Sequence, residues 1–133
     1  MRQGVFIIFL ITTICGANSS MAQSLNEIDN KINHAIQAGS IEQLSPYLNT
    51  TIELCIPDKE GSFSKTQSKV IIQSFFKKYP PNSYSIKNQG TSSDGSNFSI
   101  GEYLSGNTIF RTYFVTKKSN DKILLFQLHF EKK

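Results

Sequence analysis

Two charged residues stand among apolar ones in the stretch SIGEYLSGNTIFRTYF at positions 99–114. Glu102 and Arg111 are in step with the apolar residues rather than between them. If Gly106-Asn107 forms a two-residue hairpin turn, Glu102 lies directly opposite Arg111 on the next strand. Such a pair either orients a ligand or is a structural cross-strand ion pair. We favour the structural pair and keep ligand binding as the alternative.

The same register gathers apolar residues on the face that carries this pair. A second turn at Ser119-Asn120 would place Tyr113 opposite Phe126 and Arg111 opposite Leu128, which adds the last strand to that face. We therefore predict that this face points inward. A small pocket on it would be lined by the following candidates: Glu102, Arg111, Tyr113 and Tyr84. Tyr84 belongs to this set only if the loop at Asp94-Gly95 has an odd length.

The opposite face mixes aromatic and small polar residues, a composition between that of a core and that of a solvated surface. Such a face suits a partner sheet, most simply one from a second copy of the chain. We predict a homodimer interface formed by Tyr103, Phe110, Phe114, Leu125 and His129. The position of His129 then indicates an interface or solvent-exposed residue rather than a catalytic one.

Few residues have the spacing that catalysis or metal binding requires. A general base needs a pKa near the working pH, whereas Arg111 would hold Glu102 ionised. Neither histidine is expected beside Cys55, so a cysteine nucleophile is a minor alternative. Asp58 and Glu60 do not match a calcium loop. We predict no catalytic residue, no metal and no cofactor, with an isomerase-like or dehydratase-like enzyme as the alternative.

Residues 1–22 have the pattern of a cleaved secretory signal. A basic start is followed by an apolar run of about ten residues and by Ser-Met-Ala. The run is too short to span a membrane. We predict cleavage after Ala22 and export to the periplasm or the extracellular space. Lipid attachment at Cys15 is the disfavoured alternative, because the residues before it do not fit a lipoprotein site.

Residues 23–133 have the length of a single domain. The full chain has 14 Lys and Arg against 10 Asp and Glu. The basic residues lie scattered near the ends of predicted elements rather than in a stripe, so we expect no nucleic-acid partner. Removal of the signal leaves Cys55 as the single cysteine, which excludes a disulfide within the mature chain. We favour burial of Cys55 as a small apolar residue over a disulfide that joins two chains.

Three helix-start signals divide the first half of this domain. Ser24, Ser40 and Ser64 are each followed three residues later by Glu or Gln, as in a capping box. They predict helices over 25–38, from residue 41 to near Pro46, and over 65–78. The third helix should bury Val70, Ile71 and Phe75.

Alternating apolar residues predict the strands. One strand is expected within 51–56, and four more follow at 84–89, 98–104, 109–116 and 123–131. Helices followed by consecutive strands indicate an α+β domain: a curved antiparallel sheet of four to five strands packed on the N-terminal helices, in the order α-α-β-α-β-β-β-β.

This order of elements resembles the nuclear-transport-factor-2-like superfamily of cystatin-like α+β folds. The resemblance implies a cone in which a curved sheet wraps a long helix, often with a pocket on the concave face and a dimer contact on the outer face. More narrowly, DKEGSFSKTQ, FFKKYPP, NFSIGEYLSGNTIFRTYF and QLHFEKK are similar to an uncharacterised family of small exported bacterial domains of unknown function. That family supplies no catalytic residues.

These observations together predict an exported, non-catalytic binding module. It would form a homodimer and hold a small lipophilic or polar ligand in the concave pocket. A pure protein-interaction module of the cell envelope is a further alternative.

Overall fold

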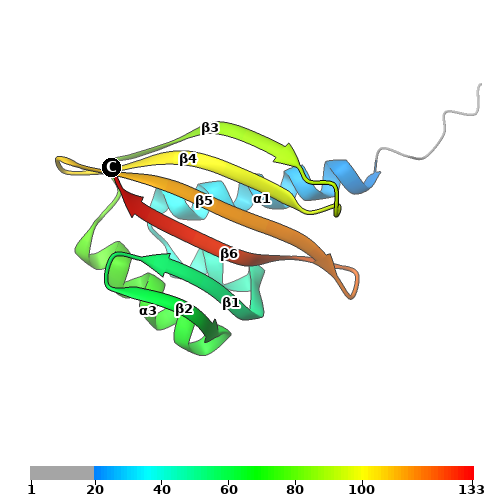
Figure 1. Cartoon of the computed structure of the whole chain (residues 1–133), viewed down its shortest axis with the longest axis horizontal. Coiled ribbons are helices and arrows are strands. Elements are labelled where there is room, and N and C mark those ends of the chain that lie inside the picture. The colour runs from blue at the N-terminus through cyan, green and yellow to red at the C-terminus, as the bar shows by residue number, and fades with distance from the viewer. Residues whose placement is uncertain (1–19) are drawn as a thin grey trace, which may run out of the picture.

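One mixed sheet with helices on a single face makes up the protein (Figure 1). The computed structural model describes residues 20–133, so most of the predicted signal segment, including Cys15, lies outside the described residues. The elements are α1 (Ser20–Ala38), α2 (Ile41–Leu44), the 3-10 helix η1 (Ser45–Tyr47), β1 (Leu48–Ile56), β2 (Lys59–Ser64), α3 (Lys65–Lys78), β3 (Ser83–Thr91), β4 (Asn97–Ser105), β5 (Thr108–Ser119) and β6 (Lys122–Lys132).

The sheet has six strands in the order β2-β1-β6-β5-β4-β3. This confirms the α+β fold and corrects the predicted strand count of four to five. The added strand is β2, whose sequence KEGSFS has one large apolar residue and therefore no alternation to detect. β1 and β6 are parallel, and the other neighbours are antiparallel, so the sheet is mixed rather than fully antiparallel.

Side chains at two predicted helix starts form the expected caps. Ser64 and Gln67 make a full capping box at the start of α3, and Ser40 accepts a hydrogen bond from the backbone N–H of Gln43. α1 begins at Ser20, so the third predicted cap at Ser24 falls inside the helix. The prediction for Val70 was wrong: its exposed fraction is 62 %, because α3 turns a different side toward the sheet.

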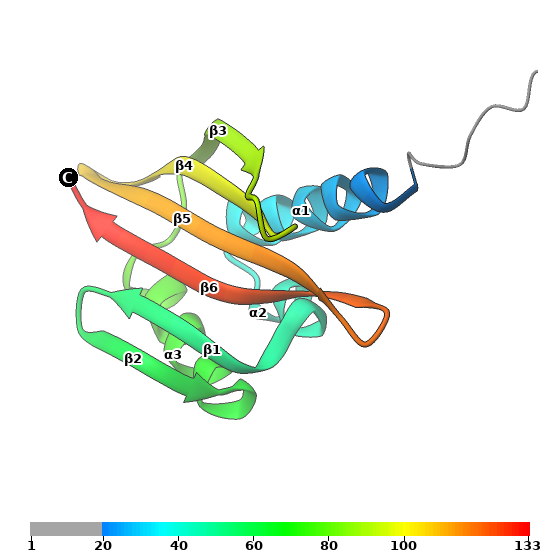
Figure 2. The same cartoon turned by 45° about the vertical axis from the view of Figure 1, so that its right-hand side comes forward.

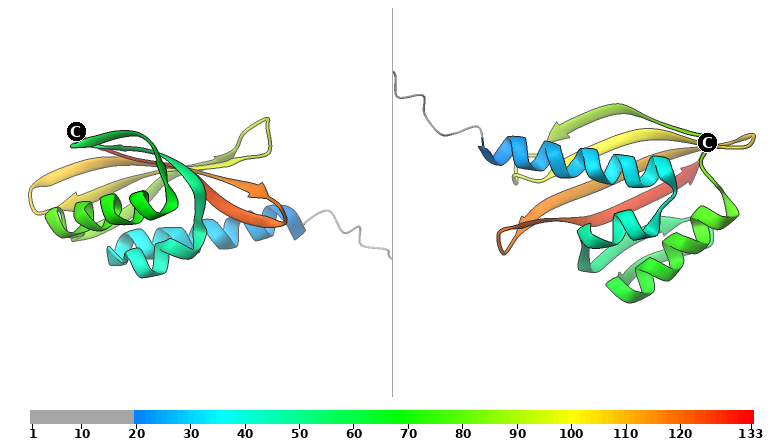
Figure 3. Two further views of the ribbon diagram at one scale, coloured as in Figure 1. Left: turned by 90° about the horizontal axis from the view of Figure 1, so that it is seen from below. Right: turned by 180° about the vertical axis from the view of Figure 1, so that it is seen from behind.

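The hairpin of β4 and β5 has the predicted register but the opposite orientation. Glu102 lies opposite Arg111. The buried face is the one that carries Ser99, Tyr103 and Phe110, each with no exposed surface. Figure 3 shows the helices on only one side of the sheet. We call this helix-covered side the inner face and the other side the outer face.

The mixed composition of the inner face is what allows the helices to pack there. Gly101 lies under the ring of Tyr84, and a Cβ at Gly101 would be 2.7 Å from that ring. Below α3, large side chains are needed instead. Phe75 stacks on Phe130 with ring centroids 4.3 Å apart, and its centroid lies 5.2 Å from that of Phe110. Small residues beside large aromatic ones therefore fill an uneven space between helices and sheet.

The β5–β6 hairpin differs from its predicted register. Its turn is Asn120-Asp121, with φ of 48° and 64°, and the pairing shifts between Val115 and Thr116. The shift is a bulge, which exchanges the faces of the residues beyond it. Consequently Arg111 lies opposite Glu131 rather than Leu128.

Candidate functional site

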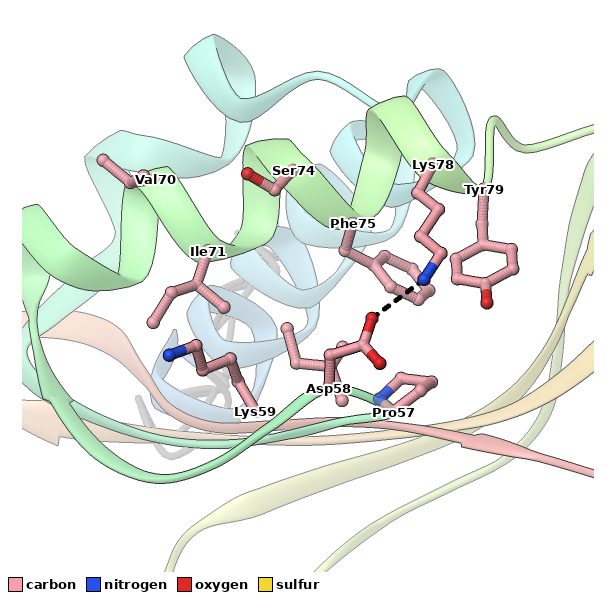
Figure 4. Close-up of a pocket in the computed structure, with 10 residues that line it drawn as sticks. Pro57, Asp58, Lys59, Val70, Ile71, Ser74, Phe75, Lys78 and Tyr79 are labelled. Carbon is pink, nitrogen blue, oxygen red and sulfur yellow. Dashed lines mark hydrogen bonds and ion pairs between the residues drawn. The ribbon is translucent and has the colours of Figure 1, made fainter.

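The concave feature with the most suitable chemistry lies between α3 and the turn that joins β1 to β2 (Figure 4). We call it the α3 cleft, and its volume is about 300 Å³. It is lined by Ile56, Pro57, Asp58, Lys59, Val70, Ile71, Ser74, Phe75, Lys78 and Tyr79.

Local folding explains how these two segments meet. The two-residue turn Pro57-Asp58 returns the chain into β2, and Ser64 then starts α3 in the opposite direction along the inner face. Phe75 is buried and forms the floor of the cleft together with Ile56. Tyr79 lies at the end of the helix, with its ring centroid 5.4 Å from that of Phe75.

The mouth of the cleft carries an exposed ion pair. Lys78 Nζ donates a hydrogen bond to Asp58 Oδ2 at 3.0 Å, and this contact raises the pKa of Lys78. The ammonium groups of Lys78 and Lys132 also lie 5.5 and 5.4 Å from the centre of the Tyr79 ring. The cleft is thus apolar inside with cations at its rim.

This arrangement suits binding more than catalysis. Ligand pockets are mostly apolar and contain a few polar groups that fix orientation. Asp58 is the single carboxylate among the lining residues, and it is exposed and already paired with Lys78. Within the described residues, no group of three or more His, Cys, Asp or Glu side chains could hold a metal ion.

A buried polar network lies on the inner face, away from the cleft. Asp29 on α1 has an exposed fraction of 1 %, and its Oδ1 accepts a hydrogen bond from Thr116 Oγ1 at 2.7 Å. Asn97 also hydrogen-bonds Asp29, and Thr91 donates to Asn97 Oδ1 at 2.8 Å. Burial raises the pKa of Asp29, although the bonds from Thr116 and Asn97 lower it in part.

Tyr84 joins this network rather than a pocket on the Glu102 face. Its hydroxyl donates to Asn33 Oδ1 at 3.3 Å, one turn along α1 from Asp29. Burial and the nearby Asp29 carboxyl raise the pKa of Tyr84. On the same inner face, the hydroxyl oxygens of Ser99 and Thr112 are buried and have no hydrogen-bond partner.

The structure does not bring the four predicted pocket residues together. Glu102, Arg111 and Tyr113 lie on the outer face, whereas Tyr84 is on the inner face, which corrects the predicted inward orientation of the first three. Glu102 receives a hydrogen bond from Lys133 Nζ at 3.2 Å, rather than pairing with Arg111. An outer-face depression of about 240 Å³ is lined by Arg111, Tyr113, His129 and Glu131.

The predicted dimer face is largely the core of the protein. Tyr103, Phe110, Phe114 and Leu125 are fully buried beneath the helices, so these four assignments were wrong. His129 does lie on the outer face, opposite Tyr113 and with Nε2 3.9 Å from Glu53 Oε1. The four assignments were wrong because the helices cover this face of the sheet, so its aromatic residues pack against α3 instead of a second copy.

Cys55 lies half-buried on β1, in step with the outward-facing Glu53. Burial raises the pKa of its thiol, and the surrounding carboxylates of Glu60, Glu131 and Glu53 raise it further. A thiol with a raised pKa is protonated at neutral pH and is a poor nucleophile. This counts against the alternative of cysteine catalysis.

Sequence reasoning missed the α3 cleft. It considered Asp58 only as a calcium ligand, which the spacing excluded, and it expected Val70 to be buried. No local pattern links residues 57–59 with residues 70–79, because their contact depends on β2 and its reversal into α3. The paired lysines at the end of α3 are the one available signal, since Lys78 supplies the charge at the mouth.

Comparison with known proteins places the chain in a family. The model of the family described as Domain of unknown function (DUF4783) matches residues 29–131. No curated protein matches. None of the described helices is both long and apolar enough to cross a membrane.

Solved structures show the same fold. A DUF4783 family protein from Bacteroides uniformis superposes with a TM-score of 0.74 at 24 % identity, over 80 % of this chain and 97 % of that chain. One from Bacteroides ovatus gives 0.72 at 26 % identity, over 77 % and 93 %. An NTF2-like protein of unknown function from Shewanella baltica gives 0.61 at 12 % identity, over 89 % and 98 %, and shares the fold.

Proposed function

Since this chain belongs to the DUF4783 family and has the NTF2-like fold, we propose that it is an exported, non-catalytic binding domain whose ligand enters the α3 cleft. The observation that carries the proposal is an apolar cavity of about 300 Å³ with a lysine at its mouth. The pattern of residues 1–22 supports export.

The chemistry of the cleft defines the class of ligand. Ile71, Phe75 and Tyr79 offer apolar surface, so the body of the ligand is apolar. Lys78 and Lys132 place ammonium groups 5.5 and 5.4 Å from the centre of the Tyr79 ring, so the ligand carries an anionic group at its exposed end. This ligand class replaces the one expected near Glu102.

Enzymatic activity finds less support. Glu102 is half-exposed on the outer face and paired with Lys133. The carboxyl group of Asp29 is buried, and it is hydrogen-bonded to Thr116 and Asn97. A general base must reach the proton that it abstracts, and neither carboxylate adjoins the cleft.

The outer face supports self-association as a second part of the proposal. The residues on a solvent-exposed face of an antiparallel sheet are usually polar. This face instead carries half-buried apolar side chains on three strands: Phe98, Ile100, Leu104, Ile109, Tyr113 and Phe126. A second copy placed against this face would cover them and form an isologous dimer.

A fluorescent probe tests the cleft. Anilinonaphthalenesulfonate has an apolar ring system and one sulfonate, which match the floor and the rim. Replacing the exposed Ser74 with Trp fills the cleft from α3, and we expect the affinity for the probe to fall by about tenfold or more, equivalent to ~1.4 kcal/mol. Fluorescence titration measures the dissociation constant.

The matched control is Gln37→Trp, which places the same side chain on an exposed position of α1. Affinity within about twofold of wild type is expected there. Equal binding by the wild type and Ser74→Trp, with both proteins folded by circular dichroism, would exclude the cleft as the ligand site.

A further inference from the structure

β2 is an unprotected edge of the sheet. It pairs with β1 in an uninterrupted register, and in the described part of the chain no strand lies on its other side. Figure 2 shows β2 as the lowest strand, with α3 behind it. The opposite edge strand, β3, is irregular between Ile86 and Asn88, a feature that discourages pairing with another chain.

A groove runs beside this edge. A second depression, of about 420 Å³, is lined by Phe63, Thr66 and Gln67 and shares Lys59, Val70 and Ile71 with the α3 cleft. Together the two depressions extend from the β1–β2 turn to the start of α3, along the length of β2. We call them the edge groove. Val70, the one strongly exposed large apolar side chain of the described residues, lies in it.

We propose that the edge groove binds an extended polypeptide segment, which adds to β2 as a seventh strand. The inference rests on the proposed function of the cleft and names its partner. Alternate residues of an edge strand point their N–H and C=O groups away from the sheet, where they can pair with an incoming main chain. Side chains of the added strand alternate between faces, so every second one enters the groove.

The spacing of the groove fits this mode of binding. Residues i and i+2 of a strand are about 6.6 Å apart. Lys59 borders both depressions, and Phe63, four residues further along β2, lines the second. A segment of five to seven residues, by the strand rise of about 3.3 Å per residue, would thus reach from one depression to the other. Its inward side chains would be apolar.

Charge completes the description of the partner. Lys59 and Lys78 line the two depressions, against one carboxylate, that of Asp58. The carboxylate of Asp58 is already paired with Lys78. The rim is therefore basic, and the partner is an acidic segment with alternating apolar residues. A second copy of the chain fits less well, because its own β2 offers Phe63 as the single large apolar side chain.

Blocked synthetic peptides test the proposal on the whole protein. The probe acetyl-DDVSISVDD-amide alternates apolar and polar residues between acidic ends, and acetyl-DDVVSSIDD-amide has the same composition without the alternation. We expect calorimetry to show binding of the first peptide that is about tenfold tighter or more than binding of the second. Equal affinities would overturn the proposal.

N-methylation then distinguishes strand addition from insertion of side chains alone. One variant of the first peptide is methylated at its three apolar residues and another at its two serines. Since only alternate N–H groups face β2, one variant should lose binding about tenfold or more while the other stays within about threefold. Two variants that bind equally well would contradict strand addition. Because the protein is unchanged, this test does not depend on the folding of a mutant.

A protein variant locates the site. Ser62→Pro removes a main-chain donor from β2, with Ser62→Ala as its matched control. Loss of peptide binding in Ser62→Pro alone is expected. If the fluorescent probe binds the cleft and the peptide does not, the inference fails while the proposed function stands; if neither binds, both fail. Dimerisation that Ser62→Pro abolishes, without peptide binding, would assign the edge to a second copy.

Discussion

Asp29 is the residue whose environment departs most from that of an ordinary aspartate. It is buried against β5 and satisfied by hydrogen bonds from Thr116 and Asn97. Burial disfavours the charged form, and therefore the pKa of Asp29 rises above the ordinary aspartate value of 3.8. The folded protein binds this proton more tightly than the unfolded chain does.

The pH dependence of stability follows from this difference. The contribution of Asp29 is fully present below pH 3.8 and is lost as the pH rises through the raised folded pKa, at about 1.4 kcal/mol per unit of upward shift. Asp29→Asn removes the titration. Urea unfolding of both proteins from pH 3.5 to pH 8 should show the wild type losing stability relative to the variant as pH rises. A constant difference, or one of opposite sign, would contradict the buried carboxyl.

Among the elements, two of the hairpin loops, those after β3 and after β5, differ in what they require of their residues. Asn120 and Asp121 both have positive φ, the conformation of a two-residue turn that favours glycine. The carboxylate of Asp121 is fully exposed and lies 4.0 Å from Lys118 Nζ, so it adds little. By contrast, Asp94 accepts hydrogen bonds from the N–H and hydroxyl of Ser96 at 3.0 and 2.6 Å.

The same substitution in the two loops should therefore have opposite effects. Asp121→Gly is expected to stabilise the protein by about 0.5 kcal/mol, because glycine adopts positive φ without strain. Asp94→Gly is expected to destabilise it, through the lost hydrogen bonds to Ser96. Denaturant midpoints at constant m-value measure both. A destabilised Asp121→Gly would mean that the side chain has a role which the turn geometry does not explain.

Most elements were predictable, and the faces of the sheet were not. The capping box fixed α3 to its observed bounds, and Gly106-Asn107 placed Glu102 opposite Arg111. The orientation failed because aromatic residues such as Phe110 share the inner face with Gly101, Ser99 and other small residues. From the sequence alone, such a mixture is typical of a partly polar surface, and only the positions of the helices show that it is the core. β2 and the cleft carried no periodic signal.

For the whole molecule, two adjacent residues of β5 lie on opposite faces of the sheet and can test which face is the core. Phe110 is fully buried, and its neighbour Ile109 is half-buried on the outer face. Phe110→Asp should unfold the domain, with a loss of more than about 3 kcal/mol. Ile109→Asp should keep the fold and abolish the proposed dimer.

Circular dichroism and sedimentation velocity read the two properties separately. The wild type is expected to sediment as a dimer at micromolar concentration and Ile109→Asp as a monomer. A folded Phe110→Asp would contradict the assignment of the inner face. A wild type that stays monomeric would remove self-association from the proposed function without affecting the cleft.

The position of β6 has a consequence for how the chain acquires its structure. β6 lies between β1 and β5 in the sheet, and it supplies Leu125, Leu128 and Phe130 to the core. Its parallel partner β1 comes some seventy residues earlier along the chain, a separation that slows folding. During synthesis, β1–β2 and β3–β5 therefore cannot join into one sheet until β6 has been made. This delay suits the export that we propose, because a chain whose sheet is still incomplete stays unfolded for translocation.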